Sequence, residues 1–149
     1  QVSSALEVNM WQRDIPIERR HGITRCVRAR IFDRGLGPVL LMFGLSPQTD
    51  ALTEVSRSQA QTVLEALLWK DLAHRAEVMS LQKARELAHE FVASLAEENT
   101  KYFVNADWSL YLRKPNGFSF TGLTDSTFDG GVVALSGGFA ACVWVEDKD

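Results

Sequence analysis

The chain has 149 residues, a length that suits one domain and lets it bury roughly 70% of the surface that the unfolded chain exposes. Apolar residues make up 46% of the sequence and charged residues 23%, ordinary values that exclude a disordered ground state. We therefore expect residues 1–149 to form a single domain. No apolar run is long enough to span a membrane and no basic-then-apolar leader opens the chain, so we expect a cytoplasmic protein.

Charge is distributed unevenly along the chain, whose net charge is −3. Residues 1–37 carry seven Arg against four acidic residues and have a net charge of +3, whereas residues 115–149 have a net charge of −4. Two interpretations remain open. If both ends belong to one sheet, opposite charges can neutralise each other across strands. Alternatively, the acidic end forms a patch that attracts a partner.

The first third of the chain predicts two strands. Residues 1–20 give no clear assignment, although 5–11 suit an edge strand. Alternation over 23–33 predicts a strand with one polar face. The unbroken apolar run Val39–Phe43, bounded by glycine and proline, predicts a second strand that is buried on both faces and paired with the first.

Apolar residues at helical spacing over 58–95 predict two helices in the middle of the chain. Ser58 and Gln61 form a capping-box pattern that starts the first helix. Ser80 is the expected cap of the second helix, which ends near Glu98-Asn99. The apolar stripes expected to face the core contain Ala60, Val63, Leu64, Leu67, Leu68 and Leu72, followed by Leu81, Ala84, Leu87, Ala88, Phe91, Val92 and Leu95.

The last third predicts a run of antiparallel strands separated by turns. The expected strands are 102–105, 108–113, 118–121, 132–135 and 139–145. Asn116-Gly117 predicts a hairpin turn between the second and third of these, because Asn-Gly readily takes the conformation that tight hairpins need. The sequence thus predicts an α+β fold of order ββ-αα-ββββ. Its antiparallel sheet contains strands from before and after a central pair of helices, and the helices cover one face.

The loop Asp125–Gly131 resembles the start of a calcium-binding loop, because carboxylates and hydroxyls precede glycine. The twelfth position, Ser136, lacks the bidentate Glu that such a loop needs. We therefore favour a turn held by side-chain hydrogen bonds to the backbone. Sequence motifs for phosphate loops, dinucleotide binding, zinc proteases and nucleophile elbows are absent, and we expect no metal, cofactor or catalytic residue.

Cys26 and Cys142 are the only cysteines, and we expect both to be reduced core residues. A thiol–base pair of Cys26 with His21 would require a sharp bend at Gly22. His74 and His89 lack a second ligand at helical spacing, so we interpret them as surface or cap residues.

Three groups of residues are candidates for contact with a partner. Arg28, Arg30 and Arg34, on a single strand face, can grip phosphate or carboxylate, with Arg25 on the opposite face unless a bulge intervenes. Carboxylates of the last third can form an acidic patch, and an exposed Trp at the edge of the first helix can anchor an interface. The candidate partner-binding residues are Asp125, Asp129, Glu146, Asp147, Arg28, Arg30 and Trp69.

These patterns favour a small non-catalytic protein-binding module that inhibits a partner protein or complex through a charged patch. Bacterial immunity proteins and phage-encoded inhibitors are of this kind, and the partner can belong to a nucleic-acid-handling complex. We do not expect direct nucleic-acid binding, because the acidic chain lacks uncompensated cations. The alternative is an enzyme or a ligand-binding or metal-binding domain that uses the Asp125–Gly131 loop with the Arg28 and Arg30 face.

Overall fold

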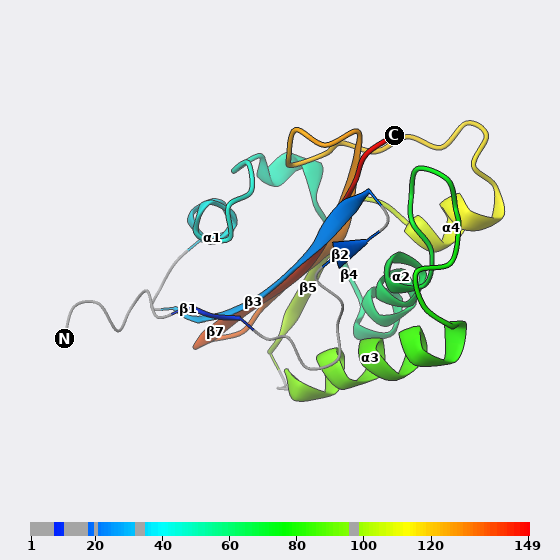
Figure 1. The fold of residues 1–149 in the computed structure, drawn as a ribbon. Helices are drawn as coiled ribbons and strands as arrows, with labels where there is room; N and C mark the ends of the chain where they lie inside the picture. The colour runs from blue at the N-terminus through cyan, green and yellow to red at the C-terminus, as the bar shows by residue number, and fades with distance from the viewer. Residues whose placement is uncertain (1–7, 11–17, 20, 32–34, 96–98) are drawn as a thin grey trace.

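A computed structural model describes residues 8–10, 18–19, 21–31, 35–95 and 99–149 (Figure 1). Its helices are α1 (Leu36–Met42), α2 (Arg57–Trp69), α3 (Leu81–Ser94) and α4 (Trp108–Arg113), with a short 3-10 turn, η2 (Thr49–Ala51). Its strands are β1 (Val8–Met10), β2 (Glu18–Arg19), β3 (Gly22–Arg30), β4 (Thr53–Val55), β5 (Lys101–Val104), β6 (Phe128–Leu135) and β7 (Phe139–Asp147).

The described strands form one antiparallel sheet in the order β1-β3-β7-β6-β5-β4, with β2 also paired to β3. The predicted α+β class is therefore confirmed, and strands from before and after the central helices share a sheet. The longest pairing joins β3 to β7 from Gly22 opposite Asp147 to Arg30 opposite Phe139. Segments from near the two ends of the chain thus lie side by side in the sheet (Figure 1).

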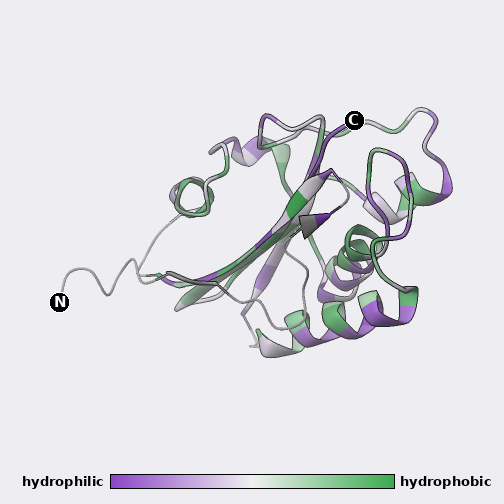
Figure 2. Ribbon diagram, in the orientation of Figure 1, coloured by the Kyte–Doolittle hydropathy of each residue, from purple (hydrophilic) through white to green (hydrophobic). Residues whose placement is uncertain are grey.

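Helices lie on both faces of the sheet (Figure 1). The predicted helix pair, α2 and α3, covers one face together with α4, and α1 covers the other. Side chains of β7 alternate between the two cores: Val143 packs on the side of α2, and its neighbours Cys142 and Trp144 pack on the side of α1. Burial on both faces explains why β7 reads as a continuous apolar run (Figure 2).

The stripes predicted for the two central helices are buried, except that Leu81 at the start of the second stripe is half-buried. Leu64, Leu67, Leu87 and Phe91 are at most 1% exposed. The first helix begins two residues earlier than predicted, because the capping box is formed by Ser56 and Gln59. The Oγ of Ser80 accepts the N–H of Lys83, as predicted for the second cap, and α3 ends at Ser94, before the expected Glu98-Asn99.

The predicted strand Val39–Phe43 is wrong, because this segment belongs to helix α1 and its C-cap. Pro38 lies in the first turn, where its missing N–H would have no helical partner. Gly44 follows the helix with φ of +80°, and the N–H groups of Gly44 and Leu45 donate to carbonyl oxygens of the last turn at 3.0 and 2.9 Å. The glycine and proline therefore mark the ends of a short helix.

The predicted strand 108–113 is also wrong, because these residues form α4. Asp107 caps this helix by accepting the N–H groups of Ser109 and Leu110 at 3.2 and 3.3 Å. Alternation over six residues is also compatible with helical spacing, and the cap decides between the two. The predicted strand 118–121 lies in a loop, so Asn116-Gly117 does not join two strands.

Gly130 and Gly131 lie within β6 rather than at the entrance to a hairpin. A Cβ on Gly130 would overlap the indole of Trp108, and a Cβ on Gly131 would overlap Trp144 and the backbone of β7. Trp108 belongs to the core on the side of α2, and Trp144 to the core on the side of α1. The glycine pair therefore lets two buried indoles lie against opposite faces of the same strand.

Replacing Leu67 by Ala should lower the free energy of unfolding by about 2–5 kcal/mol, because Leu67 is fully buried and the change leaves a cavity. Leu41→Ala is the matched control. That side chain is 61% exposed, so its loss should alter the free energy of unfolding by no more than about 0.5 kcal/mol. Urea unfolding of both variants measures the difference. Equal midpoints would show that the core-facing side of α2 is misassigned.

Gly130→Ala should lower stability by about 1–3 kcal/mol, because the new methyl group displaces Trp108. Gly137→Ala is the control, since a Cβ there meets nothing within 4 Å and its φ is not positive. Thermal unfolding followed by Trp fluorescence compares the two. An unchanged Gly130→Ala melting curve would contradict the indole packing.

Candidate functional site

A groove opens where β3 begins and β7 ends, on the sheet face that α1 covers. Ile23 and Arg25 of β3 point to this face, and Glu146 of β7 lies directly opposite Ile23. The groove consists of two hollows of about 590 and 310 Å³, and Glu146 lines both of them. The larger is bounded by the end of α1 and the loop 122–127, and the smaller by His21 and Lys148.

An ion pair between Arg25 and Glu146 forms the floor of the groove. Nη1 of Arg25 also donates to the carbonyl oxygen of Phe43, the C-cap residue of α1, at 3.2 Å. Oε1 of Glu146 accepts the hydroxyl of Ser126 at 2.9 Å. The side chains of Arg25 and Glu146 are 26% and 14% exposed. The pair therefore joins β3, β7, α1 and the loop 122–127 in one fixed arrangement.

Two exposed apolar side chains flank this polar floor. Leu41 on α1 lines the larger hollow and is 61% exposed, and Ile23 lines the smaller hollow and is 41% exposed. The only other large apolar side chain exposed in the described ranges is Leu110, on α4 across the sheet. Leu41 and Ile23 thus each line one of the two hollows that Glu146 also lines.

The predicted acidic patch is divided by the fold. Asp125 is exposed at the rim of the groove, and Glu146 lies in its floor. Asp129 and Asp147 are each 1% exposed, so neither presents a carboxylate at the surface. The four carboxylates do not form the common surface that their closeness in sequence suggested, because alternation and register bury two of them.

Asp129 holds the loop that precedes β6. Its carboxylate accepts the N–H groups of Leu123 and Thr124, the hydroxyl of Thr124 and the Nε1–H of Trp144, at 2.7 to 3.0 Å. This is the turn that the sequence favours over a calcium site. Across the described ranges, no three His, Cys, Asp or Glu side chains gather as metal ligands.

Asp147 belongs to a buried ion pair with Arg19 of β2. The Nε and Nη2 groups of Arg19 donate to its two oxygens at 2.8 and 2.9 Å, and the N–H of Leu72 donates to it at 2.7 Å. Arg19 also donates to the carbonyl oxygens of Leu67 and Lys70 at 2.7 and 2.9 Å. This pair ties the C-terminal end of α2 to the sheet.

Trp69 is half-buried and engaged within the chain. Its Nε1 donates to Glu77 at 3.0 Å, and the ammonium group of Lys70 lies 4.2 Å from the ring centroid. Nearby, Asp71 is buried. Burial opposes its ionisation, but the N–H groups of Ala76 and His74 hold the pKa of Asp71 below its usual value. Trp69 therefore belongs to a rigid corner that follows α2.

The two cysteines are free and buried, as predicted. Burial raises the pKa of Cys26 to about 12 and raises the pKa of Cys142 well above its usual value, so both thiols are neutral at pH 7. Cys26 faces the core of α2 while His21 is exposed, and β3 runs without a bend from Gly22. The thiol–base pair considered from the sequence is not formed.

Arg28 and Arg30 point to the α2 side of β3 and Arg25 to the α1 side, as the alternation predicts. Arg34 lies outside the described residues. The loop that contains Asp125 lies near the opposite end of β3. The arginine face and the loop are thus on different faces and at different ends of the sheet, so they do not form one site.

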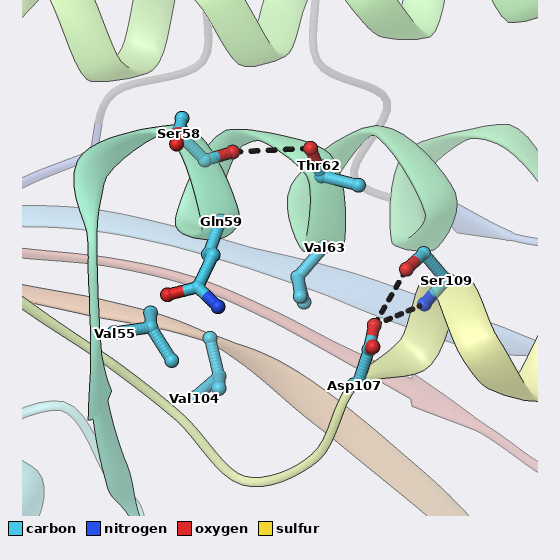
Figure 3. Close-up of a pocket in the computed structure, with 8 residues that line it drawn as sticks. All are labelled: Val55, Ser58, Gln59, Thr62, Val63, Val104, Asp107 and Ser109. Atoms are coloured by element: carbon cyan, nitrogen blue, oxygen red, sulfur yellow. Dashed lines mark hydrogen bonds between the residues drawn. The ribbon is translucent and has the colours of Figure 1, made fainter.

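A smaller hollow of about 200 Å³ lies between the first turns of α2 and α4 and the ends of β4 and β5 (Figure 3). Val55, Val63 and Val104 form its apolar wall. The amide of Gln59 and the carboxylate of Asp107 also face it, but both act as helix caps. The groove at Glu146 is therefore the better candidate site.

Comparisons of the chain with protein-family models, curated proteins and solved structures find no match. None of the helices in the described ranges combines the length and the apolar composition that crossing a bilayer requires.

Sequence reasoning missed Leu41 and Ile23 as site residues, because it assigned Leu41 to a buried strand and Ile23 to a covered face. The Gly44 stop signal after an apolar run was the available clue to a helix with one outward residue.

Asp147→Asn should lower the free energy of unfolding by about 3–5 kcal/mol, because it leaves the buried Arg19 guanidinium without its counter-charge. Asp125→Asn makes the same chemical change at an exposed position and should alter the free energy of unfolding by no more than about 0.5 kcal/mol. Chemical unfolding at pH 7 measures both. Equal destabilisation of the two variants would contradict the division of the acidic residues into buried and exposed.

Proposed function

We propose that this protein is a non-catalytic binding module that inhibits a partner protein by docking it on the groove between Ile23 and Leu41, in the manner of immunity proteins and phage-encoded inhibitors. One observation carries the proposal: two exposed apolar side chains flank the ion-paired floor of Arg25 and Glu146. Interfaces combine apolar anchors with arginine and a polar rim, and this groove contains all three.

The rigidity of the groove supports the same proposal. Arg25 and Glu146 belong to the adjacent strands β3 and β7 and hold the end of α1 and the loop 122–127 by hydrogen bonds. A partner therefore meets a preformed surface and does not have to order it, which favours tight binding. Asp125 at the rim makes no hydrogen bond or ion pair in the described structure and remains free to attract a cationic group.

The partner expected from this surface presents apolar side chains beside a basic group. The apolar side chains would cover Leu41 and Ile23, and the basic group would face Asp125. The partner would then be inhibited because this protein covers the partner's own basic and apolar site. This chemistry suits an enzyme that handles nucleic acid, because such an enzyme carries basic residues at its working surface.

A site-specific photo-crosslinking residue at position 41 should capture this partner from a lysate of the native host, and the same residue at position 110 should not. Leu110 is the matched control because it is also a large exposed side chain but lies across the sheet. Mass spectrometry identifies the captured protein. Capture that is equal at both positions, or absent at 41, would contradict the groove as the docking surface.

The purified partner then allows a quantitative test. Leu41→Glu should weaken binding at least about tenfold, because it places a charge in an apolar contact, and Leu110→Glu should change the affinity less than twofold. The wild-type protein should inhibit the partner's activity, and Leu41→Glu should inhibit it only at higher concentration. Binding without any effect on the partner's activity would contradict the inhibitory role. Unchanged melting temperatures confirm that both variants fold.

A further inference from the structure

Two arginines lie over one aromatic ring at the far end of the β3–β7 pair. Arg28 and Arg30 face the α2 side of the sheet, and their guanidinium carbons are 5.6 and 6.0 Å from the ring centroid of Phe139. Phe139 is the first residue of β7 and lies directly opposite Arg30. The ring attracts both guanidinium groups, and the paired strands β3 and β7 hold the three residues side by side.

Neither guanidinium forms an ion pair with a carboxylate within the described ranges of the chain. Arg30 is exposed and Arg28 is half-buried. Elsewhere on β2 and β3, Arg19 and Arg25 each bind a carboxylate of β7. Among the residues that the structure describes, no carboxylate therefore balances the charge of Arg28 and Arg30, and their N–H groups are available to an external anion.

The spacing of the two arginines indicates the shape of that anion. Residues two apart on a strand are roughly 7 Å apart and point the same way. An extended peptide with carboxylates at alternate positions has the same repeat. Successive phosphates of a nucleic acid are similarly spaced, but nucleic-acid binding needs several cations along the backbone, and this strand face presents two.

We propose that Arg28 and Arg30 bind an acidic protein segment whose carboxylates occupy alternate positions of an extended chain. Each guanidinium would donate two parallel hydrogen bonds to one carboxylate, while Phe139 supports both planes from below. The inference rests on the proposed function in taking the ligand to be part of a protein partner. Because this surface lies on the opposite face and at the opposite end of β3 from the groove, the two can be tested separately.

The test uses a fluorescent peptide of about ten residues with Glu at alternate positions, titrated with the protein at low salt and followed by fluorescence anisotropy. Arg28→Gln with Arg30→Gln should weaken binding about tenfold or more, because two charge-assisted contacts are lost. Arg113→Gln with Lys114→Gln removes the same charge from another exposed surface and should change the affinity less than twofold. Arg28→Lys with Arg30→Lys keeps the charge but loses the planar guanidinium group, so its affinity for the peptide should lie between those of the two Gln double variants.

Several outcomes would overturn the inference. They are absence of peptide binding to the wild type, equal loss in the Arg113 and Lys114 control, and equal affinity for a peptide of the same composition with consecutive Glu residues. Tighter binding of a single-stranded oligonucleotide of equal charge, dependent on Arg28 and Arg30, would assign the site to nucleic acid instead. Leu41→Glu should leave peptide binding unchanged, so failure of the groove proposal and failure of this one are distinguishable.

Discussion

The pairing of β3 with β7 is the constraint on which the rest of the structure depends. It brings the basic first part of the chain beside the acidic last part, and the charges meet at one end of the pair. Arg19 and Arg25 each find a carboxylate of β7 there. Neutralisation across strands therefore accounts for part of the uneven charge along the sequence, and the arginines at the other end of β3 are what remains. The two proposed binding surfaces, the groove at Glu146 and the face of Arg28 and Arg30, lie at the two ends of this strand pair.

Burial on both faces of the same strands explains several features that look unrelated in the sequence. Because cores lie above and below β6 and β7, most of their side chains are apolar, and their buried carboxylates are hydrogen-bonded. Asp129 and Asp147 meet this condition, each with partners for its carboxylate from several segments. They join α2 and the loop before β6 to the sheet. Two acidic residues that the sequence analysis assigned to a surface patch thus hold elements together in the fold.

Long elements could be predicted and short ones could not, because periodicity needs several turns to be decisive. The stripes of α2 and α3 extend over 13 and 14 residues and identify their buried faces correctly. Helices α1 and α4 have seven and six residues, for which a period of 2 and a period of 3.6 fit almost equally well. The deciding signals were local: Asp107 before α4 and Gly44 after α1. The candidate site escaped prediction for another reason: Asp129 and Asp147 are buried because of the way β6 and β7 pair in the sheet, and local sequence patterns do not reveal that pairing.

The two ionisable groups in the floor of the groove, Arg25 and Glu146, already maintain its shape, which suits the binding role that we propose. Both oxygens of Glu146 accept contacts, one from Arg25 and one from Ser126. Arg25 in turn holds the last carbonyl group of α1. A substrate would have to break these contacts to use Arg25 or Glu146 as a proton donor or acceptor, whereas a protein partner can cover both side chains with the contacts intact. What remains available is the apolar surface of Leu41 and Ile23 and the free carboxylate of Asp125. In such a groove the apolar contacts would mainly set the dissociation rate of a partner, and the charge would mainly set its association rate.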